Sequence, residues 1–139
     1  MQSRNLIAII DDDALVRDSV QRLIRSMGFE AEQFSSPDDF LGSASLDATW
    51  CIVSDVNMAD AGAEFLQDRL KVLGYDIPIV FMTGRPNRAT LAKLMEAGAL
   101  SVLRKPFNQQ EITRCFAQAR ARRHFAGESS ALAALNGAH

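Results

Sequence analysis

The stretch Cys51-Ile52-Val53-Ser54-Asp55, followed by Val56-Asn57-Met58, decides how this chain is organised. A run of apolar, strand-forming residues ends in a carboxylate, and the chain then leaves the strand without another apolar pair. A sheet presents an acidic side chain at its edge in this way. Asp55 is therefore a candidate site residue rather than a member of the core.

Three other apolar stretches end in polar residues in the same manner. Leu6 to Ile10 ends in three aspartates, Ile77 to Met82 ends in Thr83-Gly84, and Leu100 to Leu103 ends in Arg104-Lys105-Pro106. Because the carboxyl ends of parallel strands lie along one edge, where ligands of open α/β folds bind, these polar groups are expected to meet there. The sequence therefore predicts a site that gathers carboxylates, a hydroxyl and an ammonium group.

The composition predicts one globular domain. The chain has 139 residues, of which 47% are hydrophobic, and such a chain buries roughly two thirds of the surface that its unfolded form exposes. Its net charge of -2, from 15 basic and 17 acidic residues, favours neither nucleic acid nor an anionic membrane as a direct partner. The apolar run before the first aspartates is too short for a signal-peptide core or a spanning helix. We therefore expect a soluble, cytoplasmic protein.

The two cysteines are expected to be small buried hydrophobic residues. Cys51 lies in a predicted strand and Cys115 on the apolar side of a predicted helix. This placement fits free thiols in a reducing compartment better than a disulfide. Without nearby histidines, a zinc site is improbable.

Helices are predicted between the strands from the spacing of apolar residues. They cover about 16–27, 37–42, 65–73, 89–97 and 112–123, and strands are expected at 6–10, 29–34, 50–54, 77–82 and 100–103. Asp13 and Ser36 are expected to cap the first two helices. Gly28, Gly74 and Gly98 are expected to end the first, third and fourth.

Strands separated by helices of this length imply right-handed crossovers and one parallel sheet covered on both faces. We therefore predict an α/β fold, a flavodoxin-like (βα)5 doubly wound parallel sheet with strand order 2-1-3-4-5. The domain is expected to cover residues 1–123. Residues 124–139, which are rich in Ala, Ser and Gly, are predicted to be a C-terminal tail or linker.

In this strand order the first and third strands are neighbours and flank the topological switch point, where the strand order reverses. Asp11, Asp12 and Asp55, at the ends of these two strands, are therefore expected to lie side by side. Carboxylates within ~5 Å of one another repel by a few kcal/mol per pair even at an effective dielectric constant near 20, so a cation is needed. Mg²⁺ suits such a set of oxygen ligands. With the metal present, Asp55 would attack a phosphoryl group, and the Lys105 ammonium would share the developing charge. Thr83 would donate its hydroxyl to a phosphoryl oxygen and be drawn inward with its loop.

Five motifs, in order and spacing, resemble the receiver domain of two-component response regulators over residues 4 to about 123. They are Ile9-Ile10-Asp11-Asp12-Asp13, Val53-Ser54-Asp55, Phe81-Met82-Thr83-Gly84, Ala97-Gly98-Ala99 and Lys105-Pro106-Phe107. Any one of these motifs is weak evidence, whereas the five together are specific. The Lys-Pro-Phe motif is most similar to regulators that carry a helix-turn-helix output domain.

The resemblance assigns roles to the residues at the predicted sheet edge. It implies that Asp55 is the phosphoacceptor, that Asp12 binds Mg²⁺ directly and that Asp11 binds it through water. Asn57 would be a ligand through its backbone carbonyl. The family is a signalling phosphoacceptor and not an enzyme, beyond its own phosphorylation and slow dephosphorylation.

Thr83 and Lys105 are, by the same resemblance, the pair that senses the phosphoryl group, and a cis peptide bond is implied between Lys105 and Pro106. The phosphoryl donor would be a histidine kinase or a phosphotransfer protein of a phosphorelay. The signal would pass to a downstream protein or a second copy of the chain. The face implied for this contact is formed by the predicted helix at 89–97, strand at 100–103 and helix at 112–123.

Three features depart from the family pattern. The loop from Met58 to Gly62 lacks the usual proline and is one residue shorter. Val102 stands where the family has an aromatic switch residue, so no ring can rotate behind Thr83. Arg85, two residues after Thr83, is either a solvated loop residue or a modulator that binds phosphate or shields it from water.

Two other interpretations remain open from the sequence. A degenerate receiver would bind partners without being phosphorylated, and acyl phosphate formation distinguishes it. A haloacid-dehalogenase-like phosphohydrolase would use Asp11 as its nucleophile, but the late acidic pair and the cap insertion of those enzymes are absent. The basic residues of the last helix, Arg114, Arg120, Arg122 and Arg123, are expected to be solvated, as the helix dipole favours.

Overall fold

The computed structural model describes residues 5–58 and 62–136, in which five strands alternate with five helices. The strands are β1 (Leu6–Ile10), β2 (Glu30–Phe34), β3 (Thr49–Asp55), β4 (Ile79–Thr83) and β5 (Ser101–Arg104). The helices are α1 (Ala14–Ser26), α2 (Pro37–Leu41), α3 (Ala63–Leu73), α4 (Arg88–Glu96) and α5 (Gln109–Asn136), with a 3-10 turn, η1, at Leu46–Ala48.

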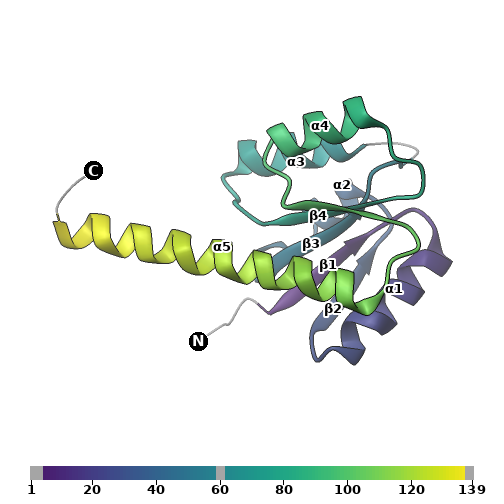
Figure 1. The fold of residues 1–139 in the computed structure, drawn as a ribbon, viewed down its shortest axis with the longest axis horizontal. Helices are drawn as coiled ribbons and strands as arrows, with labels where there is room; N and C mark the ends of the chain where they lie inside the picture. Colours follow the sequence, from purple (N-terminus) through teal and green to yellow (C-terminus); the bar gives the residue numbers. More distant parts are fainter. Residues whose placement is uncertain (1–4, 59–61, 137–139) are drawn as a thin grey trace.

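The strands form one parallel sheet in the order β2-β1-β3-β4-β5, as predicted (Figure 1). Ile10 of β1 pairs with Ser54 of β3, so the residues that follow them, Asp11 and Asp55, reach the same edge together. Asp55 in turn pairs with Met82 of β4, the residue before Thr83. The register of the strands therefore brings the predicted site residues to one level of the sheet.

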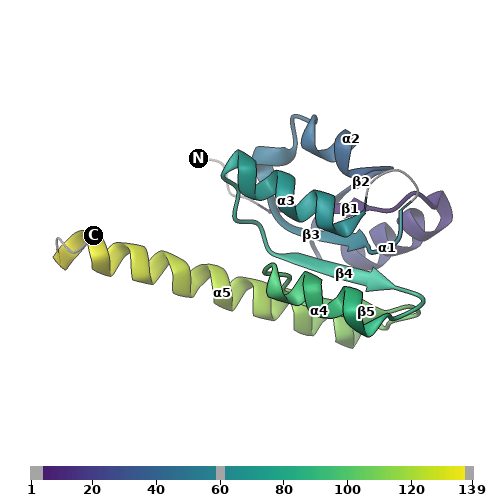
Figure 2. The ribbon, with the colours of Figure 1, turned by 90° about the horizontal axis from the view of Figure 1, so that it is seen from above.

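Both faces of the sheet are covered, because the strands are apolar on both sides. Residues of α1 and α5 pack on one face, and residues of α2, α3 and α4 pack on the other. Figure 2 shows α2 and α3 on one side of the strands. Cys51 and Cys115 are free and buried in the layer formed with α1 and α5, as the sequence predicted.

Helix termini follow the predicted signals. The Asp13 carboxylate accepts the backbone N–H groups of Leu15 and Val16 at the start of α1. The hydroxyl of Ser36 accepts the N–H of Asp39 at the start of α2. The three predicted stops, Gly28, Gly74 and Gly98, all have positive φ, and Gly74 is a left-handed C-cap with φ 82°.

The predicted end of the last helix near Arg123 is wrong, because α5 continues to Asn136 and extends past the sheet (Figure 1). Apart from Leu132 and Leu135, the residues beyond Arg123 offer no apolar face, so the spacing of apolar residues did not indicate a helix there. The residues beyond Arg123 contain five alanines and no proline. Alanine is the best helix former, and extending an existing helix needs no new nucleus. The assignment of residues 124–139 as a C-terminal tail or linker stays a prediction.

Other element boundaries differ from the prediction by one to three residues. Strand β4 begins at Ile79, so Pro78 lies before the strand and only its carbonyl takes part, accepting the N–H of Ile52 at 2.9 Å. Between α2 and β3, Leu46–Ala48 form the η1 turn, an element that the apolar spacing did not predict. Within the described residues, no helix combines the length and the apolar character that crossing a membrane requires.

Candidate functional site

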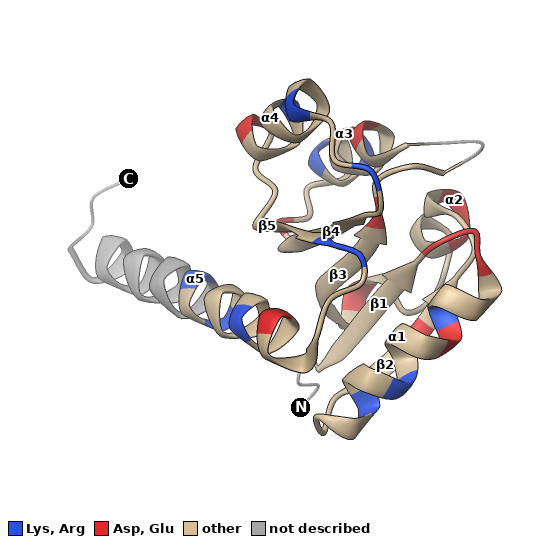
Figure 3. Cartoon of the chain, turned by 45° about the vertical axis from the view of Figure 1, so that its right-hand side comes forward, with Lys and Arg blue, Asp and Glu red and all other residues tan. Residues whose placement is uncertain are grey.

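Three carboxylates meet at the C-terminal edge of the sheet, as predicted. Asp11, Asp12 and Asp55 each offer an oxygen, and these oxygens all lie within 4.8 Å of one another. We call this group the acidic triad. Figure 3 shows acidic segments at the ends of β1 and β3 and a basic segment at the end of β5, on the same side of the sheet. Asp11 and Asp55 are 1% and 6% exposed, whereas Asp12 is exposed.

Lys105 contacts two members of the acidic triad. Its Nζ lies 2.8 Å from Oδ1 of Asp55 and 3.2 Å from Oδ2 of Asp11. The backbone N–H of Lys105 donates to the carbonyl of Thr83 at 2.8 Å, which ties the end of β5 to the end of β4. The Lys105–Pro106 peptide bond is cis.

The pKa values of Asp55 and Lys105 are both raised, for different reasons. Burial raises the pKa of Asp55, and the hydrogen bond and charge of Lys105 offset this only in part. Burial alone would lower the pKa of Lys105, but the hydrogen bond and charge of Asp55, with the charge of Asp11, outweigh it. The single positive charge of Lys105 is also too small to balance three ionised carboxylates.

The backbone and side chain of Asp11 are held by several donors. Its Oδ1 accepts the N–H of Asp13 at 2.9 Å, and its carbonyl accepts Nη1 of Arg17 at 2.7 Å. Arg17 was not among the residues predicted for this site. One signal was available, because a cation close to the N-terminus of a helix opposes the helix dipole and needs a compensating contact.

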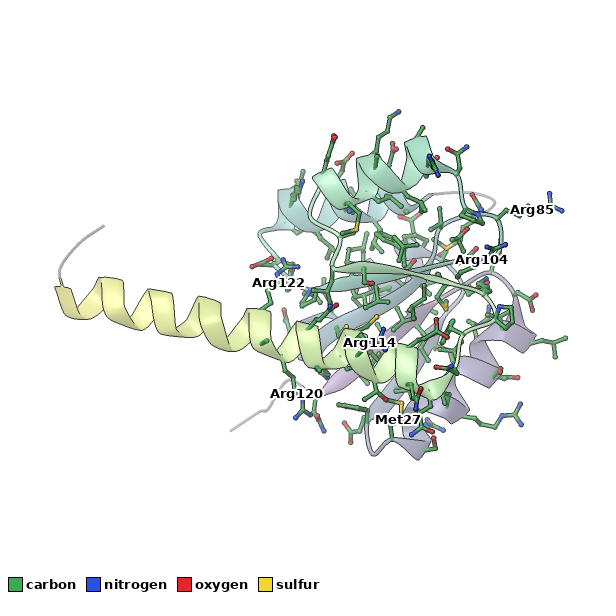
Figure 4. All side chains as sticks on the ribbon, in the orientation of Figure 1. Met27, Arg85, Arg104, Arg114, Arg120 and Arg122 are labelled. Carbon is green, nitrogen blue, oxygen red and sulfur yellow. The ribbon has the colours of Figure 1, made fainter. Side chains whose placement is uncertain are left out.

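Thr83 lies at the end of β4, beside the acidic triad, and is 2% exposed. Its Oγ1 accepts the backbone N–H of Arg85 at 3.1 Å. This bond uses an oxygen lone pair, so the hydroxyl can still donate its own proton. The side chain of Arg85 is exposed and points away from the body of the molecule (Figure 4). The structure thus couples the backbone of Arg85, not its cation, to Thr83.

The remaining predicted positions lie around this edge. Asn57 is exposed, two residues beyond Asp55, and its role as a metal ligand stays a prediction. Of the shortened loop from Met58 to Gly62, residues 59–61 lie outside the described residues. Val102 of β5 pairs with Phe81 of β4 and packs against the core layer that contains α4.

The donors of the acidic triad fit a hard divalent cation. Carboxylate oxygens are the protein ligands that Mg²⁺ prefers, and the ion commonly takes only one or two of them directly and keeps several waters. Two of the three carboxylates are buried, and burial makes their mutual repulsion more costly. A bound cation would relieve this repulsion.

A family comparison agrees with this geometry. The model of the response regulator receiver domain matches residues 7–117. The chain belongs to the response regulator receiver family. Family membership sets aside the haloacid-dehalogenase interpretation, in which Asp11 would be the nucleophile.

Several characterised response regulators are similar to this receiver. It is 36% identical over 108 residues to the response regulator protein TodT of Pseudomonas putida, which covers 78% of this chain and 48% of TodT. It is 33% identical over 133 residues to the transcriptional regulatory protein FixJ of Bradyrhizobium diazoefficiens, covering 96% of this chain and 65% of FixJ. The receiver thus spans about half the length of TodT and two thirds of FixJ.

Solved structures show the same fold. Full-length FixJ from B. japonicum superposes with a TM-score of 0.80 and 33% identity, covering 95% of this chain and 65% of that one. A response regulator receiver protein from Burkholderia phymatum superposes with a TM-score of 0.69 and 32% identity, covering 82% and 93%.

Proposed function

We propose that this receiver is a Mg²⁺-dependent phosphoacceptor switch in which Asp55 takes a phosphoryl group from a histidine kinase or phosphotransfer protein in the cytoplasm. The observation that carries the proposal is the contact of Lys105 with both Asp55 and Asp11 inside the acidic triad. This arrangement places a nucleophilic carboxylate next to a fixed cation and a set of oxygen ligands.

The reaction follows from this arrangement. A carboxylate oxygen of Asp55 attacks phosphorus, and the P–N bond of the donor phosphohistidine breaks with its electron pair passing to the imidazole. The new P–O bond makes an acyl phosphate. Lys105 lies where it can neutralise charge on the transferred oxygens. Mg²⁺, held by Asp11, Asp12 and Asp55 with the carbonyl of Asn57, would stabilise the same charge.

Thr83 would sense the product. Its hydroxyl can donate to a phosphoryl oxygen, and its Oγ1 already accepts the N–H of Arg85, which leads into α4. Movement of Thr83 toward the phosphoryl group would therefore pull this loop. Because Val102 carries no ring, we propose that the signal reaches the α4-β5-α5 face through the loop itself. A downstream protein or a second copy of the chain would bind there.

The donor would dock beside Lys105. Leu15, which is 80% exposed, lines an apolar hollow of about 420 Å³ together with Val16, Ser19, Pro106 and Phe107. Lys105 lines the same hollow. An apolar surface this close to the acidic triad suits a helix that carries the donor histidine.

The test is the intact mass of the chain after incubation with acetyl phosphate and Mg²⁺. We expect the native chain to gain one phosphoryl group, Asp55→Asn to gain none, and the matched surface variant Asp38→Asn to behave like the native chain. A native chain that gains nothing would favour the degenerate receiver that binds partners without phosphorylation. A gain retained in Asp55→Asn but lost in Asp11→Asn would move the nucleophile to the end of β1.

A further inference from the structure

Arg17 makes an unusual pair of contacts behind the acidic triad. Its Nη1 donates to the carbonyl of Asp11 at 2.7 Å, and its Nε donates to Oε1 of Gln33 in β2 at 3.2 Å. One guanidinium thus joins the end of β1 to the edge strand of the sheet. The side chain binds a backbone carbonyl of the site rather than pairing with a carboxylate.

Gln33 holds the guanidinium in one orientation. Its Nε2 donates to Oδ1 of Asp18 at 2.8 Å and to Oε1 of Gln21 at 2.7 Å. Gln21 in turn donates to the carbonyl of Ala31 at 2.8 Å. Because a guanidinium can only donate, and both neighbours of Nε2 accept, the amide oxygen of Gln33 must face Arg17. The network from Ala31 to Asp11 therefore has a single consistent set of donors and acceptors.

We propose that Arg17 is a positioning residue that, held by Gln33, fixes the peptide between Asp11 and Asp12 and thereby sets the Mg²⁺ affinity of the acidic triad. The inference rests on the proposed Mg²⁺ site. The carbonyl of Asp11 lies in the same rigid plane as the nitrogen and Cα of Asp12. A donor that fixes this carbonyl also fixes where the exposed Asp12 side chain leaves the backbone.

Charge and position predict opposite effects of removing Arg17. As a cation near the acidic triad, Arg17 repels Mg²⁺, so its loss would strengthen binding if charge alone mattered. As a positioning residue, its loss frees the Asp11–Asp12 peptide, so binding weakens. Loss of an outer contact behind a metal ligand typically weakens metal affinity by about 10- to 100-fold.

The experiment is a titration with MgCl₂ alone, followed by the backbone amide resonances of residues 11–13 in the full chain. We expect Arg17→Ala and Gln33→Ala each to weaken Mg²⁺ binding by about tenfold, and the double variant to be no weaker than Arg17→Ala. The matched control is Arg22→Ala, which removes an exposed guanidinium from the same helix whose only described contact is a 3.5 Å bond to the carbonyl of Asp18. Its affinity should equal that of the native chain.

Phosphorylation by acetyl phosphate gives a second readout. The concentration of Mg²⁺ that gives half the maximal rate should rise in Arg17→Ala and Gln33→Ala by the same factor as the dissociation constant. The rate at saturating Mg²⁺ should stay native, because Arg17 does not touch the nucleophile. If Arg17 had a merely structural role, its loss would lower the melting temperature. It would not raise the Mg²⁺ concentration for half-maximal rate while leaving the rate at saturating Mg²⁺ native.

Unchanged or tighter Mg²⁺ binding in both variants would overturn the inference while leaving the proposed function in place. If Arg17→Ala does not fold, the Mg²⁺ affinity of Gln33→Ala tests the inference alone, because this variant retains the Arg17 guanidinium. A native chain that binds no Mg²⁺ would overturn the proposed function and the inference together.

Discussion

Lys105 contacts two of the three carboxylates of the acidic triad. In the proposed function, this contact would oppose metal binding and favour phosphoryl transfer. Before the reaction, the positive charge of Lys105 offsets part of the negative charge of the carboxylates, which weakens their attraction for a metal ion. During the proposed transfer it would face the oxygens on which charge develops. Individual side chains of this site are therefore best tested by readouts that separate binding from chemistry.

Replacing Lys105 by alanine should strengthen Mg²⁺ binding and slow phosphorylation. The first effect follows because a competing cation is lost, and the second because one charge-stabilising contact to the transferred group is lost, which costs about 100-fold or more in rate. The measurements are a MgCl₂ titration and the rate of mass gain with acetyl phosphate at saturating Mg²⁺. Lys93→Ala, an exposed lysine of α4, is the control and should change neither quantity. A Lys105 variant with weaker Mg²⁺ binding would contradict this account.

Mg²⁺ should stabilise the fold, and more strongly at neutral than at acid pH. Burial raises the pKa of Asp55, so its contribution to stability is present below the carboxyl pKa of the unfolded chain, about 3.9, and is lost as pH rises through the folded pKa. Above the folded pKa, metal-free protein therefore carries an ionised carboxylate whose burial is unfavourable, and Mg²⁺ would bind this form. At a Mg²⁺ concentration of 100 times Kd, linkage gives about 2.7 kcal/mol.

Thermal unfolding with and without Mg²⁺ at pH 7.5 and pH 4 measures this effect. We expect a clear rise in Tm at the higher pH and little at the lower, where protonated carboxyl groups release the metal. Asp55→Asn should reduce the rise at pH 7.5. An equal rise at both pH values, or in Asp55→Asn, would place the ion elsewhere on the molecule.

At the scale of helices and strands, the sequence determines the structure most clearly at the ends of the helices. Helix α3 ends at Gly74, whose φ of 82° lies in the left-handed region, whereas α2 ends at Gly42 with φ -88°. A side chain at either position meets no severe clash, since nothing lies within 4 Å of an added Cβ at Gly74 and the nearest atom at Gly42 is 3.4 Å away. The two positions thus differ mainly in backbone conformation.

Gly74→Ala should therefore lower the free energy of unfolding by about 1–2 kcal/mol, the cost of a left-handed residue with a Cβ, and Gly42→Ala should change it much less. Urea denaturation of both variants measures the difference. Because Gly74 lies at the end of the sheet away from the acidic triad, phosphorylation of the folded Gly74 variant should remain native. Equal losses at the two glycines would mean that packing, not backbone strain, decides the effect.

The elements that the sequence predicted well are those with a periodic pattern and a definite stop. Asp13 and Ser36 cap helices as expected, and the strand ends carry Asp11, Asp55, Thr83 and Lys105 to one edge. The end of α5 was missed because a helix that extends past the core has no apolar stripe to mark it. Arg17 was missed because its proposed role depends on Gln33, 16 residues away in the sequence. The two side chains meet only because α1 packs beside β2 in the folded chain.

Over the whole molecule, α5 is held on two sides where it leaves the sheet. The guanidinium of Arg120 lies 5.4 Å from the ring centre of Phe29 and 5.7 Å from that of Trp50. Arg122 pairs with Asp76 at 2.9 Å and donates to the carbonyl of Gly98. Figure 4 shows these two arginines on opposite sides of the helix. The direction in which α5 extends is thus fixed by the body of the receiver, at the end opposite to the acidic triad.

The reactivity of the two cysteines measures whether α5 separates from the sheet, because both thiols are buried between them. Cys51 in β3 has none of its surface exposed, and Cys115 lies in α5 with 4% exposed. Burial raises the pKa of both thiols, so the reactive thiolate is scarce in the folded chain. The neutral thiols contribute fully to stability below the pKa of the unfolded thiol, about 8.5, and this contribution is lost as pH rises through the folded values.

We expect iodoacetamide at pH 8 to label neither cysteine readily in the native chain and both in urea. If labelling requires global unfolding, Mg²⁺ at 100 times Kd should slow it by about 100-fold, the factor by which bound metal lowers the unfolded population. Mass spectrometry of Cys51→Ala and Cys115→Ala assigns the two rates. If Mg²⁺ slows the labelling of Cys51 but not that of Cys115, α5 detaches from the sheet without global unfolding. The acidic triad and the last helix would then belong to separate cooperative units. Equal slowing would instead show that the acidic triad, the sheet and α5 unfold as one cooperative unit, which the proposed signalling through the α4-β5-α5 face requires.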